Sequence, residues 1–311
     1  MARAAHQFAP CKINLHLAVT GARSDGFHDL VSLVAPLAFG DRLRIEEQPD
    51  LSPDTPPRLD LGGRFSAGLP ADSGNLVLKA WAAFREAGGR LAHGLSIHLD
   101  KRVPAAAGLG GGSSDAAACL RGLNGLAERG LGEKDLASVA AGLGSDCPLF
   151  LSGRPVVMRG RGERLEPVRA DWLSRWAGWR ILVFAPHLEI STPWAYSRLR
   201  ESTGAYAAAA DAEAGLTEWL EATDLTVIQP FNSFEAVVGA KFLAIPVLLD
   251  EIRSRFGIPS ALSGSGSACF ACVAPGQPTG PLQEAIRSAL GKEVFLVETA
   301  LYQPFDHSLA R

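Results

Sequence analysis

A disulfide-type set of cysteines, long apolar runs and a large excess of one charge are all missing from this 311-residue chain. Its five cysteines are odd in number and widely scattered, which excludes the disulfide framework of a small secreted protein. No run of about 18 apolar residues occurs, and the polar residues 1–8 contain no apolar leader segment. The sequence therefore predicts a soluble cytoplasmic protein with no membrane partner.

A basic surface is also missing, because 30 Lys and Arg residues are set against 33 Asp and Glu residues, for a net charge of −3. This balance argues against nucleic acid as the main partner. Cys269 and Cys272 form a single CxxC pair without a second pair, so we expect two small buried side chains rather than a zinc site.

Hydrophobic residues make up 47% of the chain, enough to form a globular core. Apolar periodicity predicts a set of strands and helices. The expected strands are 13–19, 30–37, 42–47, 95–99, 180–185, 268–273 and 293–298, and the expected helices are 75–87, 133–142, 205–222, 232–256 and 281–290. The Pro-, Asp- and Gly-rich segment 49–74 is expected to be a surface excursion. Strands and helices do not alternate strictly, so the fold class is α+β, with a domain boundary near residue 165.

A glycine-rich loop is the strongest local signal for chemistry. It consists of Gly108, Leu109, Gly110, Gly111, Gly112, Ser113 and Ser114. Glycines adopt positive φ readily, so successive N–H groups can converge on one anion, and a helix expected from about Ser114 adds its positive end. No Gly-Lys-Ser/Thr follows and no acidic residue stands at dinucleotide-site spacing, so neither of those phosphate motifs is present. The alternative is a flexible turn with a serine cap.

Two further positions carry charge in unusual settings. Lys12 and Asn14 begin an apolar strand and, being two residues apart, share one face. Asp146 stands in a turn just before Pro148 and an apolar segment. The plain alternatives are a solvated edge strand and an Asx turn. Together, the two charges would provide a cation and a carboxylate for phosphoryl transfer, which depends mostly on positioning and neutralisation.

Three segments together resemble the three motifs of the GHMP kinases in order and spacing: 10–15, 104–116 and 262–268. Segments 25–30, 144–150, 159–163 and 231–235 are most similar to the branch that phosphorylates cytidine diphosphate methylerythritol. The resemblance covers about residues 9–273. It implies a two-domain GHMP kinase fold, with a ribosomal-protein-S5-like α/β domain at 1–164 and a ferredoxin-like α+β domain at 165–311.

The activity implied is ATP-dependent phosphorylation of the acceptor's 2-hydroxyl, a step toward isoprenoid precursors, with Mg²⁺ as cofactor. By resemblance, Asp146 is the base and Lys12 keeps it ionised, with Ser114 close to Mg²⁺. The implied ATP-binding residues are Pro104, Gly108, Leu109, Gly110, Gly111, Gly112, Ser113, Ser114, Asn75 and Lys101, the last two near the adenine. The implied acceptor-binding residues are Asn14, Phe27, His28, Ser263, Gly264, Ser265 and Gly266.

The chain departs from the family pattern at three positions. Phe27 replaces the usual Tyr, which keeps ring stacking and removes a hydroxyl. Cys11 and Cys147 replace apolar residues beside the proposed pair, so thiol alkylation is expected to slow the enzyme. The alternatives are another GHMP kinase, acting on homoserine, mevalonate or a sugar, and a catalytically silent nucleotide-binding protein of the same fold. We expect a monomer or weak homodimer.

Overall fold

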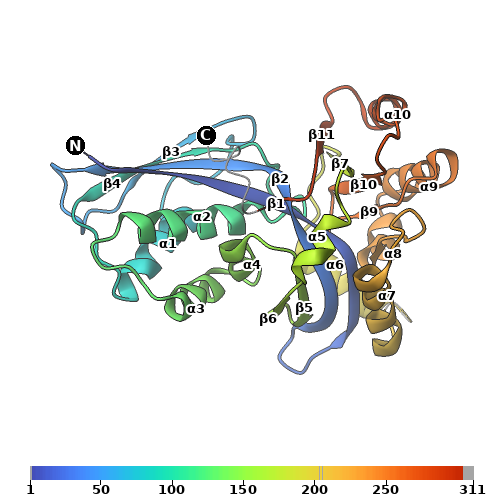
Figure 1. Cartoon of the computed structure of the whole chain (residues 1–311), viewed down its shortest axis with the longest axis horizontal. Coiled ribbons are helices and arrows are strands. Elements are labelled where there is room, and N and C mark those ends of the chain that lie inside the picture. The colour runs from blue at the N-terminus through green and yellow to red at the C-terminus, as the bar shows by residue number, and fades with distance from the viewer. Residues whose placement is uncertain (1, 203, 205, 304–311) are drawn as a thin grey trace.

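The computed structural model describes residues 2–202, 204 and 206–303 and contains two β-sheets (Figure 1). Within these residues the larger sheet has seven strands: β1 (Ala4–Ala22), β2 (His28–Gln48), β3 (Arg58–Gly62), β4 (Gly94–Asp100), β5 (Val156–Gly160), β6 (Arg164–Pro167) and β8 (Phe231–Asn232). The smaller sheet has four strands there, in the order β11 (Phe295–Thr299), β7 (Arg180–Ala185), β10 (Cys269–Val273) and β9 (Ser260–Leu262).

The long antiparallel hairpin of β1 and β2 organises the larger sheet, whose main order is β3-β4-β2-β1-β8. One end of β2 pairs with β4 and the other end with β5, so this single strand serves two parts of the sheet. Figure 1 shows the hairpin running from the N-terminal half of the molecule to the side where the smaller sheet lies. The side chains at one end of the hairpin therefore lie near β4, and those at the other end lie near β5 and the smaller sheet.

The helices of the first half lie together on one side of the larger sheet (Figure 1). They are α1 (Leu76–Glu86), α2 (Gly111–Leu126), α3 (Glu133–Leu143) and α4 (Cys147–Ser152). Helix α1 shows why they form: the Asn75 side chain accepts a hydrogen bond from the Val77 N–H, and Val77, Ala80, Trp81 and Phe84 make one buried stripe. These helices position the glycine loop, which leads directly into α2.

The second half adds helices around the smaller sheet (Figure 1). They are α5 (Ala170–Ser174), α6 (Thr192–Glu201), α7 (Ala209–Glu221), α8 (Phe234–Gly239), α9 (Ala244–Phe256) and α10 (Gly280–Leu290). One buried cluster joins the two sheets, because Ile13 and Leu15 of β1 belong to it together with Ile181 and Val183 of β7. The division into domains at 164/165 stays a prediction.

The α+β class is confirmed, and most expected elements are present, but two expected strands are joined into one and one strand was not expected. Segments 30–37 and 42–47 form one strand, β2, because a register shift of β1 between Pro10 and Lys12 absorbs the irregularity between them. The excursion 49–74 contains β3, which pairs in parallel with β4.

Two helix predictions also need correction, and one helix was missed. Helix α2 begins at Gly111 rather than at Ser114, since the Ser114 N–H already bonds to the Gly110 carbonyl. The segment expected as one helix, 232–256, is β8 followed by α8 and α9, because Pro246 lacks the N–H that would continue α8 and favours a new first turn. Helix α6 was not expected at all, although Ser191 caps it.

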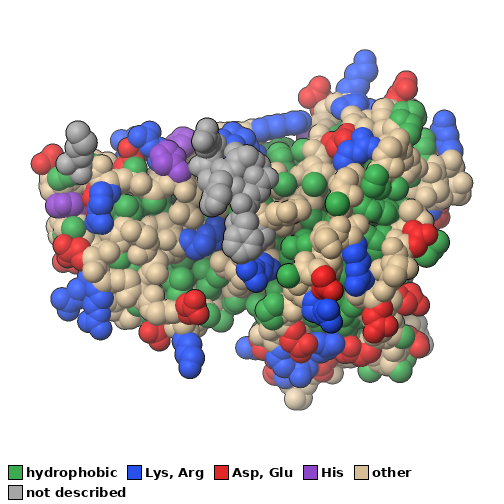
Figure 2. All heavy atoms as spheres, viewed as in Figure 1, with side chains coloured by type: hydrophobic (Ala, Val, Ile, Leu, Met, Phe, Trp, Pro, Cys, Tyr) green, Lys and Arg blue, Asp and Glu red, His purple; other side chains and the backbone are tan. Residues whose placement is uncertain are grey.

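The cysteine prediction is confirmed, since all five are buried free thiols, Cys269 and Cys272 included. None of the helices in the described part of the chain has the length and apolar character that a bilayer crossing requires. Figure 2 shows acidic and basic side chains interspersed on the viewed face.

Candidate active site

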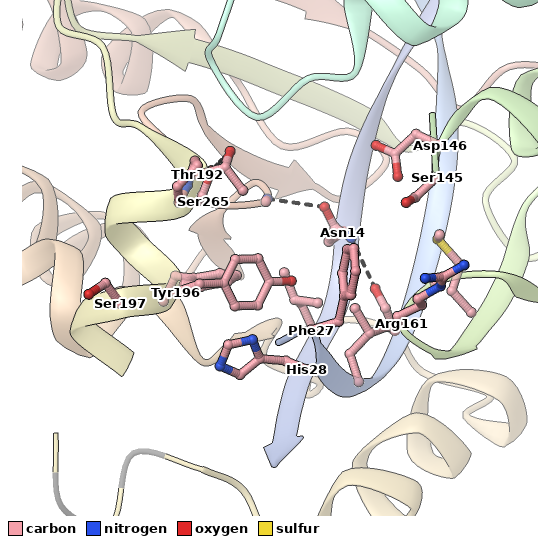
Figure 3. Close-up of a pocket in the computed structure, with 18 of the residues that line it drawn as sticks. Asn14, Phe27, His28, Ser145, Asp146, Arg161, Thr192, Tyr196, Ser197 and Ser265 are labelled. Atoms are coloured by element: carbon pink, nitrogen blue, oxygen red, sulfur yellow. Dashed lines mark hydrogen bonds between the residues drawn. The ribbon is translucent and has the colours of Figure 1, made fainter. Parts of the chain in front are cut away.

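A cavity of about 680 Å³ opens where the β1/β2 hairpin meets α4, α6 and the loop before β10. Figure 3 shows the residues that face it. The lining includes Lys12, Asn14, Ser32, Phe27, His28, Ser145, Asp146, Met158, Arg161, Gly162, Thr192, Tyr196, Ser197, Arg200, Gly264 and Ser265. One cavity thus brings together residues from five separate segments of the chain.

Asn14 is the centre of the polar network on the cavity floor. Its Oδ1 accepts hydrogen bonds from Lys12 Nζ at 2.6 Å and from the Gly264 N–H at 3.0 Å. Its Nδ2 donates to Ser32 Oγ at 3.0 Å (Figure 3). The expectation that Lys12 and Asn14 share a face is confirmed, and Asn14 also joins β1 to the 263–267 segment.

Lys12 and Asp146 face the same cavity, and their charges interact. Burial lowers the pKa of Lys12, and the nearby Asp146 carboxylate partly offsets this effect. Asp146 precedes α4, whose first turn contains Pro148. Tyr196 responds to the same environment: burial, with a further contribution from Asp146, raises the pKa of its hydroxyl to about 12. The arrangement therefore combines one buried cation, one carboxylate and one neutral phenol.

The glycine loop packs tightly against the opposite half of the molecule. Gly108 has φ +79°, and a Cβ built there would lie 2.1 Å from the Ser263 carbonyl oxygen. Ser263 Oγ donates to the Gly108 carbonyl at 3.0 Å, and the Lys12 N–H donates to the Leu109 carbonyl at 2.9 Å. Gly110, at φ +70°, then leads into α2. At position 108, only glycine tolerates both the positive φ and the close approach of the Ser263 carbonyl.

The first turn of α2 carries polar atoms that have no hydrogen-bond partner among the described residues. Ser114 Oγ and Asp115 Oδ1 are both in this state, and Ser114 is fully buried. Ser113 is less buried and lies beside Cys147. In the described part of the chain no group of three or more His, Cys, Asp or Glu side chains is placed to hold a metal ion. A metal here would take most of its ligands from phosphate oxygens and water.

Lys101 lies under this turn rather than in the cavity. Its Nζ donates to Asp115 Oδ2 at 2.6 Å and also pairs with Asp41, and all three side chains are buried. Asp41 Oδ1 accepts the N–H groups of Arg102 and Val103. Burial, followed by the Asp41 charge, raises the pKa of Asp115. The role expected for Lys101 near an adenine stays a prediction. The structure shows that the Lys101 ammonium already pairs with two carboxylates.

An aromatic group lies at the other end of the cavity. The rings of His28 and Tyr196 have centroids 4.6 Å apart, and Arg161 covers the Phe27 ring at 4.9 Å. Burial, with a smaller contribution from Arg200, lowers the pKa of His28, so its imidazole is neutral at pH 7. In Figure 3 the Phe27 ring is separated from the Tyr196 hydroxyl by open space. A flat ring with hydrogen-bonding edges fits such a slot.

The remaining predicted residues lie at different distances from this cavity. Ser265 reaches it and shares a 2.9 Å hydrogen bond with Thr192, whereas Ser263 and Gly266 hold the loop behind it. Asn75 uses its amide to cap α1 and to bond the Pro70 carbonyl. Pro104 lines a second cavity of about 420 Å³.

Sequence reasoning missed several residues of the cavity wall: Ser32, Ser145, Arg161, Thr192, Tyr196, Ser197 and Arg200. A signal existed for Thr192 and Tyr196, because Ser191 followed by Pro193 is the pattern of a capped helix start. No signal was available for Ser32, which reaches the site through strand pairing.

The thiols beside the charged pair are inaccessible. Cys11 is fully buried, and burial raises its pKa far above the usual range. Burial likewise raises the pKa of Cys147 to about 11. The expectation that alkylation slows the protein loses its basis, because neither thiol is exposed or ionised at neutral pH.

Comparison with known proteins gives consistent results. Residues 75–154 match the model of the GHMP kinases N terminal domain. The 4-diphosphocytidyl-2-C-methyl-D-erythritol kinase of Methylacidiphilum infernorum is 38% identical over 278 residues, which is 88% of each chain. The enzyme of the same name from Rhizobium johnstonii is 38% identical, covering 86% of this chain and 83% of its own.

A solved 4-(cytidine 5'-diphospho)-2C-methyl-D-erythritol kinase superposes on this structure with a TM-score of 0.71 at 31% identity, covering 96% of this chain and 99% of the other. The agreement in sequence and in fold therefore extends over nearly the whole chain.

Proposed function

Because the chain belongs to the 4-diphosphocytidyl-2-C-methyl-D-erythritol kinase family of GHMP kinases, we propose that it transfers the γ-phosphate of ATP to the 2-hydroxyl of that acceptor. The observation that carries the proposal is the single cavity with a charged pair at one end and an aromatic slot at the other. The acceptor has matching ends, a hydroxyl to be phosphorylated and a cytosine to be bound. The product serves isoprenoid precursor synthesis.

Asp146 is the proposed general base. Its carboxylate accepts the proton of the acceptor hydroxyl while that oxygen attacks the γ-phosphorus and ADP leaves. Lys12 neutralises the charge that develops on the transferred group, and its ammonium is near enough to Asp146 for the two charges to interact. Asn14 fixes the Lys12 ammonium through the 2.6 Å hydrogen bond and offers its amide to the erythritol hydroxyls.

The glycine loop and the start of α2 are the proposed phosphate site. Gly108–Ser114 supplies backbone N–H groups and the positive end of a 16-residue helix. Mg²⁺ would neutralise the phosphates, and the unpartnered Ser114 Oγ is the protein atom here that fits one of its ligand positions. The Ser265 backbone, on the facing loop, would contact the acceptor's diphosphate, whereas the Gly264 N–H already bonds to Asn14 Oδ1.

The cytosine is proposed to stack on the Phe27 ring, with the Tyr196 hydroxyl facing it across the slot and with its edge toward His28. Stacking on aromatic faces favours any base, and a neutral imidazole edge both donates and accepts hydrogen bonds, which adds selectivity. Tyr196 takes part as a neutral phenol, since the pKa of about 12 keeps it protonated. Phe27 provides the ring face without the hydroxyl of the usual Tyr.

The adenosine end of ATP is proposed to use the second cavity, where Pro104 and Phe65 lie beside the glycine loop. Asn75 and Lys101 stay the proposed residues near it, Lys101 acting through the backbone that it anchors. Five free buried thiols fit a reducing cytoplasm. A monomer or weak homodimer stays the expected state.

The test is an ADP-release assay with Mg-ATP and three acceptors: 4-diphosphocytidyl-2-C-methyl-D-erythritol, homoserine and mevalonate. We expect turnover with the cytidylyl acceptor only, because neither of the others fills an aromatic slot. Turnover with homoserine or mevalonate and none with the cytidylyl acceptor would assign the chain to another branch of the superfamily. ATP binding without turnover on any acceptor would favour the silent nucleotide-binding alternative.

A further inference from the structure

We propose that Arg161 is a positioning residue for the acceptor's base, because its guanidinium stacks on Phe27 and holds that ring as a wall of the aromatic slot. The inference rests on the proposed function and deepens it. It concerns how strongly the free protein fixes the slot before the cytosine arrives.

Phe27 needs such support, since 52% of it is exposed at the tip of the turn between β1 and β2. The backbone of this turn is held: the Phe27 N–H bonds to Asp25 Oδ1 at 3.1 Å, and its carbonyl accepts the Arg23 N–H at 2.8 Å. These bonds fix the backbone but leave the ring free to change rotamer. A half-exposed ring without a neighbour would lose rotamer entropy each time that a base stacks on it.

The Arg161 side chain packs on the Phe27 ring. Its guanidinium carbon lies 4.9 Å from the ring centroid, within cation–π range. The Arg161 backbone is itself fixed in the turn between β5 and β6, where its N–H bonds to Glu163 Oε2 at 2.7 Å. The turn between β5 and β6 therefore presents the guanidinium to the exposed Phe27 ring.

The contrast with Arg159, two residues earlier, indicates a role for Arg161. Arg159 pairs with Glu213 at 2.8 Å and with Glu166 at 2.9 Å, as arginines on a strand commonly do. In the part of the chain that the structure describes, the Arg161 guanidinium forms no such ion pair and faces the cavity instead. The Asp25 carboxylate acts on the Arg161 charge at longer range, and the guanidinium stacks on the Phe27 ring.

The stack leaves the other side of the ring for a ligand. In Figure 3, Arg161 and Tyr196 lie on opposite sides of Phe27. The order across the slot is then guanidinium, Phe27 ring, base and Tyr196. Arg161 touches Phe27 rather than the base, so its effect must pass through the ring.

The experiment is a double-mutant cycle on cytidine binding, measured by calorimetry. Cytidine has no phosphate, so direct attraction between Arg161 and an anion cannot contribute. We expect Arg161→Gln to weaken cytidine binding about threefold, the effect of one exposed cation–π contact. In a Phe27→Leu background we expect no further loss. Arg161→Lys keeps the charge over the ring and should stay within about twofold of the unmodified protein.

Arg198→Gln is the matched control. Arg198 is exposed on α6 and pairs with Glu201 rather than facing the cavity, so cytidine binding should not change. In turnover assays, Arg161→Gln should raise the KM for the acceptor about threefold and leave kcat and the KM for ATP unchanged.

Three outcomes would overturn the inference. The first is that Arg161→Gln weakens cytidine binding equally in the unmodified protein and in the Phe27→Leu background. The second is that Arg161→Gln weakens cytidine binding in neither background. The third is a loss for cytidine diphosphate but not for cytidine, which would make Arg161 a phosphate contact. Failure of the unmodified protein to bind cytidine at all would instead contradict the proposed function, so the two failures are distinguishable.

Discussion

A buried lysine whose hydrogen bond goes to an amide rather than to a carboxylate is costly, because burial disfavours its charged form. Lys12 is in this situation, because its ammonium donates to Asn14 Oδ1 and Asp146 acts on it at longer range. Lys101 shows the opposite case, since two carboxylates surround it and raise its pKa against the effect of burial. The first arrangement suits a cation that meets a transferred phosphate, and the second suits an anchor.

This difference predicts how Lys12 titrates. Burial lowers the pKa of Lys12, so its ammonium should lose its proton at a pH below 10.5, the ordinary pKa of a lysine. The alkaline fall in kcat/KM should occur at that lower pH. Asp146→Asn removes the negative charge that raises the Lys12 pKa, so the midpoint should move lower still. NMR titration of the lysine Cε signal measures both midpoints. A midpoint at or above 10.5, or one that Asp146→Asn leaves unchanged, would contradict the account.

At the scale of elements, the glycine loop acts together with the elements that it touches. Gly108 and Gly110 adopt positive φ, and their close neighbours are Ser263, Phe150 and Lys12. The loop is thus part of the contact between the two halves of the chain. Its shape depends on both halves being folded.

Gly108→Ala should therefore weaken ATP binding at least tenfold, because the new Cβ would meet the Ser263 carbonyl at 2.1 Å in a left-handed conformation. Gly142→Ala in α3 is the matched control, since nothing lies within 4 Å of the added methyl. It should stabilise the fold by about 0.5–1 kcal/mol and leave ATP affinity unchanged. Calorimetry with ATP and urea unfolding check the pair. Normal ATP affinity in Gly108→Ala would show that the loop does not hold the phosphates.

The elements also show where sequence reasoning succeeds. Local signals were sufficient in two cases: the apolar periodicity of 75–87 predicted α1, and the spacing of Lys12 and Asn14 predicted a shared face. Sequence reasoning failed where the structure of a segment depends on contacts with residues far away in the chain. Nothing within 49–74 reveals that β3 pairs with β4, and the polar Ser32 enters the site only because β2 pairs with β1. Tyr196 was missed because the helix that presents it was missed.

At the scale of the whole molecule, the core does not stop at the division expected near residue 165. The cluster that contains Ile13 and Leu15 also contains Trp172, Trp176 and Trp219, and β8 of the second half pairs with β1. The active-site cavity draws its walls from the same two halves. Folding and site assembly are therefore coupled.

This coupling predicts one cooperative unfolding transition in urea. Five of the six tryptophans lie between residues 172 and 219, so fluorescence reports the second half, while circular dichroism at 222 nm reports both. The two probes should give the same midpoint. Separate midpoints would show two independently stable units and would contradict the coupling.

Asp146 is proposed to take the proton of a hydroxyl that is held at one end of the cavity by recognition at the other end. Single-turnover phosphoryl transfer and acceptor binding, both measured in Asp146→Asn, test this role. We expect acceptor and ATP affinities within about threefold of those of the unmodified protein and a transfer rate at least 10²-fold lower, the range of general base catalysis. Transfer at an undiminished rate would contradict this role.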